Sequence, residues 1–166
     1  MTNQQELISL FESLIQRNES ETIDFKFEAY NLSIKEKQVD LVKDIVCMYN
    51  TPRKEDAHII LGVKEYTDRP KDIRGIDLST TNPKHLDQSS MQSAFQREDL
   101  EIEPFPRFRV STLQYKSKTF AIIIISVNIE VGPCKVLKSN YSKLKTDRDQ
   151  LYFRRGTDND LTTNVE

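Results

Sequence analysis

Residues 119–128 read Thr-Phe-Ala-Ile-Ile-Ile-Ile-Ser-Val-Asn, and every residue from Phe120 to Ile125 is apolar. This run is far shorter than the ~20 residues that a membrane span requires. It is typical of a central strand that is covered on both faces. Residues 107–115 also have a strand-like pattern, and only residues 116–118 separate them from the apolar run. The sequence therefore predicts a β-hairpin with its second strand inside a sheet.

Three more strands are expected outside the hairpin. Residues 23–27 alternate between apolar and polar side chains, which is the period of a half-buried strand. Residues 57–63 form a short apolar strand, and residues 151–155 form the last strand. We expect residues 156–164, which are rich in Asp, Asn and Thr, to be a loop.

Capping signals predict three helices. Capping boxes at residues 2–5 (Thr2 with Gln5) and 33–36 (Ser33 with Glu36) open helices that run to about residues 15 and 50. Asn82 before Pro83 opens a third helix, which runs through residue 95. The order β, α, β, α, β, β, β predicts an α+β (α/β) domain with a mixed sheet flanked by helices.

Length and composition exclude several protein classes. The chain has 166 residues and weighs 19.4 kDa, which is the size of one domain. Its start carries no basic and apolar leader, so we expect a cytoplasmic protein without membrane segments. Cys47 and Cys134 lie far apart and no C-x-x-C is present, which excludes a disulfide framework and a zinc site.

Charge is divided unevenly along the chain. Residues 105–155 contain eleven basic and three acidic residues, whereas the remainder contains thirteen basic and twenty-three acidic residues. Such asymmetry can steer a polyanion to one face, although an ordinary solvated surface would have the same composition. The residues predicted to contact nucleic-acid phosphates are Arg107, Arg109, Lys116, Lys118, Lys135, Lys138, Lys143, Lys145, Arg148, Arg154 and Arg155.

Three acidic residues lie next to predicted strands. Glu19 precedes the first strand, Asp24 is on its polar face, and Glu65 follows the strand over residues 57–63. Carboxylates at the ends of adjacent strands can bind Mg²⁺ or Mn²⁺, which prefer oxygen ligands. Lys26 points to the same face as Asp24 and could offset charge near a phosphate. The alternative is that these are three ordinary surface acids.

Three ordered motifs resemble the Schlafen/AlbA-like domain family. Residues 19–26, Glu-Ser-Glu-Thr-Ile-Asp-Phe-Lys, resemble its E-x-x-x-x-E-F-K opening. Asn50-Thr51 followed by residues 58–65, His-Ile-Ile-Leu-Gly-Val-Lys-Glu, resembles its second hallmark. Residues 152–157, Tyr-Phe-Arg-Arg-Gly-Thr, resemble its late Y-x-R-x-G-S/T strand. The ordered set spans nearly the whole chain.

This resemblance implies a metal-dependent endoribonuclease that cuts structured RNA such as tRNA. Glu19, Asp24 and Glu65 would be the catalytic, metal-binding triad, although Asp24 stands where the family more often has Glu. Neutralising one of three crowded carboxylates should then leave the metal-free fold equally stable or slightly more stable. The alternative is a non-catalytic nucleic-acid-binding or sensor module fused to an NTPase or another effector.

The resemblance also carries expectations about partners. Residues 1–166 would be a single domain at the N-terminus of a longer protein, with an NTPase or regulatory domain following. A homodimer could enclose an RNA duplex. Residues 52–57 stand where the family usually has a Gly-Gly pair, and no G-x-x-x-x-G-K-S/T motif is present. We therefore expect no nucleotide cofactor.

Overall fold

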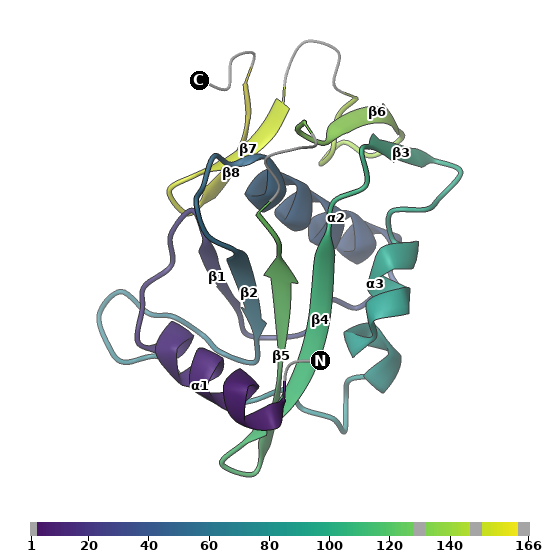
Figure 1. Cartoon of the computed structure of the whole chain (residues 1–166). Helices are drawn as coiled ribbons and strands as arrows, with labels where there is room; N and C mark the ends of the chain where they lie inside the picture. The colour runs from purple at the N-terminus through teal and green to yellow at the C-terminus, as the bar shows by residue number, and fades with distance from the viewer. Residues whose placement is uncertain (1–2, 128–131, 147–150, 163–166) are drawn as a thin grey trace.

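The computed structural model describes residues 3–127, 132–146 and 151–162, so Thr2 and Arg148 lie outside the described residues. At its centre is a four-stranded sheet in the order β1-β2-β5-β4 (Figure 1). Its strands are β1 (Ile23–Lys26), β2 (Ala57–Leu61), β4 (Phe108–Tyr115) and β5 (Lys118–Ile125). The pair β1–β2 is parallel and the other two pairs are antiparallel, which confirms the mixed sheet and the predicted hairpin.

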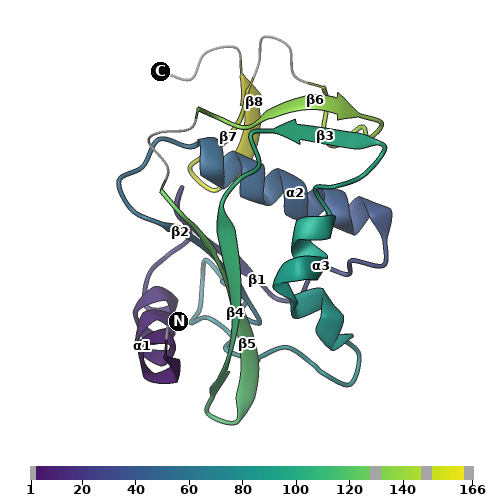
Figure 2. The ribbon, with the colours of Figure 1, turned by 45° about the vertical axis from the view of Figure 1, so that its right-hand side comes forward.

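Helices cover both faces of this sheet (Figure 2). The helix α1 (Gln4–Ile15) lies on one face, and α2 (Lys35–Asn50) and α3 (Gln88–Ser93) lie on the other. Successive residues of β5 contribute to opposite cores, with Ile122 on the α1 side and Ile123 on the α2 side. The uniformly apolar run therefore belongs to a central strand, as its composition indicated.

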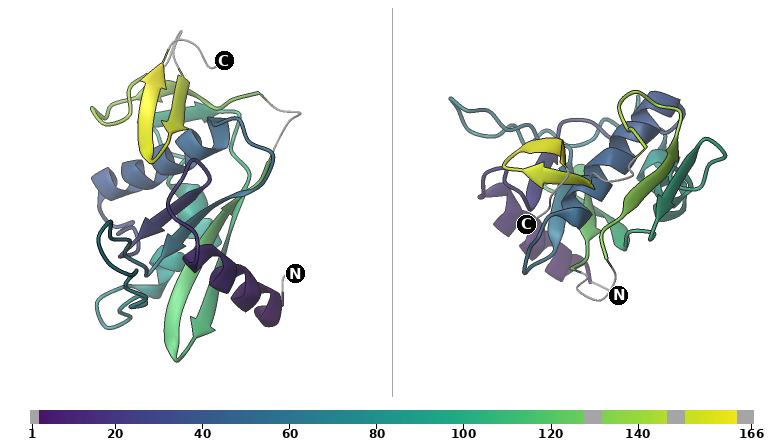
Figure 3. Two further views of the ribbon diagram at one scale, coloured as in Figure 1. Left: turned by 90° about the vertical axis from the view of Figure 1, so that its left-hand side faces the viewer. Right: turned by 90° about the horizontal axis from the view of Figure 1, so that it is seen from above.

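Two smaller strand pairs flank α2 (Figure 3). β3 (Leu100–Glu103) pairs with β6 (Lys135–Ser139), and β7 (Leu151–Arg155) forms a hairpin with β8 (Asp158–Thr162). Of these four strands, the sequence predicted only β7. The expectation of a loop over residues 156–164 is wrong for β8, because five of those residues pair with β7.

Two of the three predicted helix starts need correction, whereas Asn82 caps the third helix before Pro83 as predicted. α1 begins after Asn3, whose side chain accepts a hydrogen bond from the Glu6 amide at 2.8 Å. α2 follows Ile34, and no side chain caps it, so the predicted capping box at residues 33–36 is wrong. The third helix is divided into the 3₁₀ helix η1 (Pro83–Leu86) and α3. None of the helices in the described ranges is long and apolar enough to cross a membrane.

Candidate functional site

The parallel pairing of β1 and β2 brings two of the predicted acids together. The backbone of the turn before β1 places the Glu19 amide 3.0 Å from Glu65 Oε2, to which it donates a hydrogen bond. The Glu19 carboxylate in turn accepts a hydrogen bond from the Phe25 amide, at 3.1 Å. Lys71 Nζ lies 3.7 Å from Glu65 Oε1. Both carboxylates thus have protein partners along the outer edge of β1.

Asp24 is buried on the face of the sheet that α2 covers. Arg154 Nη2 lies 3.2 Å from its Oδ1, and Lys26 Nζ lies 3.2 Å from its Oδ2. Arg154 is only 2% exposed and also donates from Nε to the Ser20 carbonyl at 2.7 Å. It was predicted to face nucleic acid, but as placed it contacts Asp24 instead of solvent. Lys26 lies where the sequence predicted, beside Asp24.

Glu19 interacts electrostatically with the other two acids. Burial raises the pKa of its carboxyl, and the hydrogen bond from the Phe25 amide acts in the opposite direction. The charges of Asp24 and Glu65 raise this pKa further, whereas that of Arg154 lowers it. The three predicted acids therefore lie close enough to affect one another, as the motif comparison implied.

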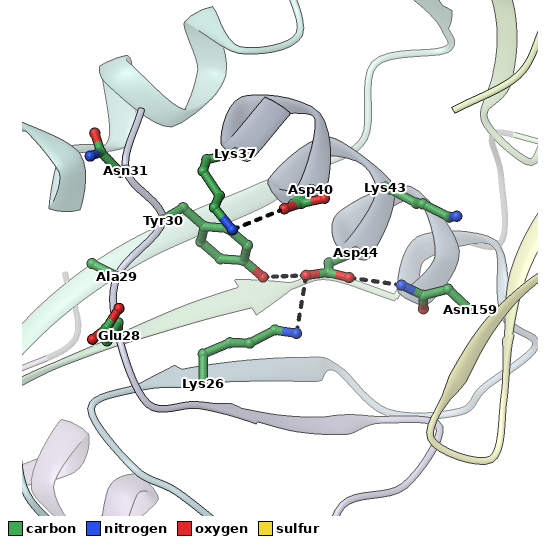
Figure 4. Close-up of a pocket in the computed structure, with 10 residues that line it drawn as sticks. All are labelled: Lys26, Glu28, Ala29, Tyr30, Asn31, Lys37, Asp40, Lys43, Asp44 and Asn159. Atoms are coloured by element: carbon green, nitrogen blue, oxygen red, sulfur yellow. Dashed lines mark hydrogen bonds and ion pairs between the residues drawn. The ribbon is translucent and has the colours of Figure 1, made fainter. Parts of the chain in front are cut away.

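A second buried carboxylate, Asp44 of α2, extends this charge network (Figure 4). Tyr30 donates a hydrogen bond to Asp44 Oδ2 at 2.5 Å, Asn159 Nδ2 donates to Oδ1 at 2.7 Å, and Lys26 Nζ lies 3.5 Å from Oδ2. Burial raises the pKa of Asp44. Burial and the charge of Asp44 also hold the pKa of Tyr30 well above its usual range. These groups border a cavity of about 420 Å³.

The pKa of Lys26 reflects its two acidic neighbours. Burial alone would lower it, but the charges of Asp44 and Asp24 outweigh burial and raise it. The sequence did not identify Asp44 or Tyr30 as part of this network. Asp44 lies among apolar residues of α2, and its partners come from distant segments of the chain.

The donor atoms suit Mg²⁺ or Mn²⁺ chemically, because all three predicted ligands offer carboxylate oxygens. Their arrangement does not fit a metal ion. Glu19 accepts from an amide, Asp24 pairs with Arg154 and Lys26, and Glu65 accepts from the Glu19 amide. Over the part of the chain that the structure describes, no group of three His, Cys, Asp or Glu residues is placed to hold a metal.

The predicted phosphate-binding residues do not form one surface. Arg107 and Arg109 lie at the start of β4, whereas Lys116 and Lys118 lie at its far end, in the turn to β5. Eight residues of extended strand separate the two ends, or roughly 27 Å at ~3.4 Å per residue. The remaining predicted residues lie on β6 (Lys135, Lys138), in the segment after it (Lys143, Lys145) and on β7 (Arg155).

A different group of basic residues lies beside the acids. Five cation–π contacts join three aromatic rings to four cations of residues 64–74, the loop that follows β2. Arg69 lies 3.9 Å from the Tyr66 ring centroid and Arg74 lies 4.7 Å from that of Phe27. We call this group the aromatic–basic surface. Its members are Phe25, Phe27, Lys64, Tyr66, Arg69, Lys71 and Arg74.

The loop that carries these cations is pinned at both ends. Lys64 and Asp72 exchange two backbone hydrogen bonds, of 3.0 and 2.9 Å, and the Gly75 amide donates to the Gly62 carbonyl at 2.9 Å. A count of net charge does not reveal this surface, because Glu65, Asp68 and Asp72 nearly balance the charge of its four cations. The signal that could have revealed it was Tyr66 between Lys64 and Arg69, with Lys71 and Arg74 following closely.

Comparisons with known proteins support the fold and the family. The family model "Schlafen, AlbA_2" matches residues 19–163. The DIP2311 protein of Corynebacterium diphtheriae shares the fold with a TM-score of 0.51 and 19% identity, over 94% of this chain and 30% of that protein. The N-terminal domain of a RecG-related, ATP-dependent DNA helicase-like protein of Nitrosomonas europaea has a TM-score of 0.52 and 16% identity, over 89% and 86%. No curated protein matches the sequence.

Proposed function

The chain belongs to the Schlafen AlbA_2 family, and we propose that it binds RNA by its phosphate backbone through the aromatic–basic surface. Family membership supports a nucleic-acid-binding domain. The residues for this role are the cations of the loop after β2, rather than the dispersed basic residues of the C-terminal half.

The observation that carries the proposal is the grouping of four cations of one pinned loop around three rings, of which Tyr66 belongs to the loop and Phe25 and Phe27 lie on and just after β1. Arg69 and Arg74 have side chains that are 62% and 63% exposed, and they pair with Asp68 at 3.9 Å and with Asp72 at 2.7 Å. The guanidinium nitrogens outside these ion pairs can reach a phosphate. Single-strand binders combine cations that follow the backbone with aromatic rings on which bases stack. The loop and the segment after β1 together offer both kinds of group, since Tyr66 and Phe27 are partly exposed, whereas Phe25 is buried.

Charge reversal on the loop tests this proposal. Lys64→Glu combined with Arg69→Glu should weaken RNA binding broadly. It should also reduce the slope of log K against log salt by about 0.7–0.9 for each phosphate that the protein no longer neutralises. Fluorescence anisotropy with a labelled RNA, measured between low and moderate salt, gives both quantities.

The matched control reverses the same number of cations at the other end of the molecule. Arg107 and Arg109 lie at the start of β4 and are exposed. Arg107→Glu combined with Arg109→Glu changes the net charge equally but leaves the aromatic–basic surface intact. An equal loss of affinity in the two double variants would refute a specific surface, because it would reflect net charge alone.

A second candidate function is metal-dependent cleavage of structured RNA such as tRNA. The proximity of Glu19, Asp24 and Glu65 favours it, whereas the present partners of these carboxylates oppose it. The test is incubation of the protein with tRNA, with and without Mn²⁺, alongside Asp24→Asn. Cutting that requires Mn²⁺ and disappears in the variant would establish catalysis at this site. An RNA that stays intact under both conditions would favour binding alone.

We also propose two features of the wider assembly, a homodimer and a following NTPase or regulatory domain. A homodimer that encloses an RNA duplex would double the number of loops in contact with one RNA. Its test is the mass of the protein alone and of its complex with duplex RNA in solution. A following NTPase or regulatory domain would make the RNA-binding domain a sensor within a longer chain.

A further inference from the structure

A cavity of about 590 Å³ adjoins the aromatic–basic surface. Phe27, which directly follows β1, and Arg74 line it, and Lys64 Nζ lies 5.7 Å from the same Phe27 ring. Asn31, Thr80, Thr81 and His85 supply polar groups elsewhere in its lining, and Glu28 and Asp77 add two carboxylates that can accept hydrogen bonds from the amino groups of a base. The cavity therefore combines a flat aromatic ring, the Arg74 cation, two carboxylates and neutral hydrogen-bonding side chains.

This combination matches the chemistry of a nucleotide. A base can stack on an aromatic ring or a guanidinium plane, and its edge needs hydrogen-bonding partners. Its phosphate needs a cation, which Arg74 and Lys64 provide at the Phe27 ring. The volume lies within the range of about 300–1,000 Å³ that is usual for small-molecule pockets.

We propose that this cavity receives one unpaired nucleotide of a bound RNA strand, with its base against Phe27 and Arg74. The inference rests on the proposed function and adds that recognition depends on unpaired bases. A base inside a duplex is stacked between its neighbours and cannot enter the cavity. Loops, bulges and single-stranded ends of an RNA can.

The experiment uses a 12-nucleotide single-stranded RNA that carries one 2-aminopurine, a base whose fluorescence changes when it stacks. Binding to the wild-type protein should change this fluorescence, and Phe27→Ala should remove the change and weaken binding at least about 5-fold. Arg74→Lys retains the charge but loses the planar group, so it should also reduce the change. Phe27→Leu provides a second variant if the alanine variant does not fold.

Two controls separate stacking from general effects. Phe105 is 40% exposed and packs on Phe95 and Phe108, so Phe105→Ala removes an exposed ring elsewhere and should leave the signal unchanged. A duplex that contains the same modified base should bind without the fluorescence change. Free adenosine monophosphate should compete only weakly, and binding as tight as that of the strand would overturn the assignment to an RNA strand.

The outcomes also distinguish this inference from the proposed function. Single-stranded RNA that binds Phe27→Ala as tightly as wild type, with the same fluorescence change, would overturn the nucleotide cavity and leave backbone binding intact. Wild-type protein that binds neither single-stranded nor duplex RNA would overturn both.

Discussion

Removal of the Arg154 side chain should destabilise the fold strongly, because this residue joins the C-terminal hairpin to the start of the sheet. Its Nη2 lies 3.2 Å from Asp24 Oδ1 and 3.3 Å from the Ile23 carbonyl, and its Nε donates to the Ser20 carbonyl. Arg154→Met replaces the side chain by an apolar one of similar length. The carbonyls of Ser20 and Ile23 and the buried carboxylate of Asp24 then each lose one partner.

The structure sets the expected size of this loss. The Arg154 and Asp24 side chains are 2% and 7% exposed, so water cannot take the place of the missing partner. Breaking a buried ion pair by removing one partner typically costs ~3–5 kcal/mol. Lys26 still faces Asp24, which favours the lower end of this range. For a domain of this length the loss corresponds to a fall of about 6–20 °C in Tm.

Asp24→Asn should also destabilise the protein, since it leaves Arg154 and Lys26 facing a neutral amide. This direction is opposite to the one that follows from three mutually repelling carboxylates. The double variant should lose about 1–3 kcal/mol less than the sum of the single losses, because each single variant already breaks the same pair.

Urea unfolding at pH 7 measures the free energy of unfolding of all three variants. Arg109→Met is the control for removal of an exposed arginine, and it should change this free energy by no more than about 0.5 kcal/mol. A loss below about 1 kcal/mol for Arg154→Met would refute the role of the buried pair. An increase in stability for Asp24→Asn, together with a rise in the wild-type Tm on adding Mn²⁺, would instead support a metal site.

Two further predictions concern single residues of β2 and its end. Burial lowers the pKa of His58 below its usual 6.5 despite the charges of Asp56 and Glu55, so the unfolded state takes up a proton first as the pH falls. The free energy of unfolding should therefore decline below about pH 6.5, and it should decline less in His58→Asn. Urea titrations of both proteins at pH 7 and pH 5 measure this difference, and equal declines would contradict the prediction. Gly62 has φ +107°, and an added Cβ would lie 2.9 Å from Phe120 Cδ1. Gly62→Ala should therefore lower the free energy of unfolding by at least about 1–3 kcal/mol in the same assay. The control is Gly132→Ala, which should have little effect because an added Cβ there meets open space.

The central sheet could be predicted because each of its strands has a local signature. Every residue from Phe120 to Ile125 is apolar, and this pattern indicates a strand whose two faces are both covered. β3 and β6 have no such signature. They are four and five residues long, and the whole of β4 and β5 lies between them in the sequence. Their pairing therefore depends on contacts that the local pattern does not encode.

The site shows the same limit for charged residues. Arg154 was assigned to the surface because an arginine is rarely buried without a partner. Its partner, Asp24, precedes it by 130 residues, and only the fold brings the two together. The aromatic–basic surface was not predicted because the acids of the same loop, Glu65, Asp68 and Asp72, nearly cancel its cations in a count of net charge.

These pairings bear on how an RNA could approach the acids. Three unpaired carboxylates would repel a phosphate, and a metal ion is the usual remedy. Here Arg154 and Lys26 contact Asp24, and Lys71 contacts Glu65, so protein cations already offset the acidic charge.

The present ion pairs of these carboxylates and a bound metal ion would therefore exclude one another. A metal ion would have to displace Arg154 or Lys26 from Asp24, and this would weaken the contact between β7 and β1. RNA binding at the aromatic–basic surface requires no such change. If the acids serve only the fold, added Mn²⁺ should weaken RNA binding equally in the wild type and in Asp24→Asn, because it competes only for phosphates. If the acids bind the metal, Mn²⁺ should change the affinity and stability of the wild type and have less effect on those of the variant.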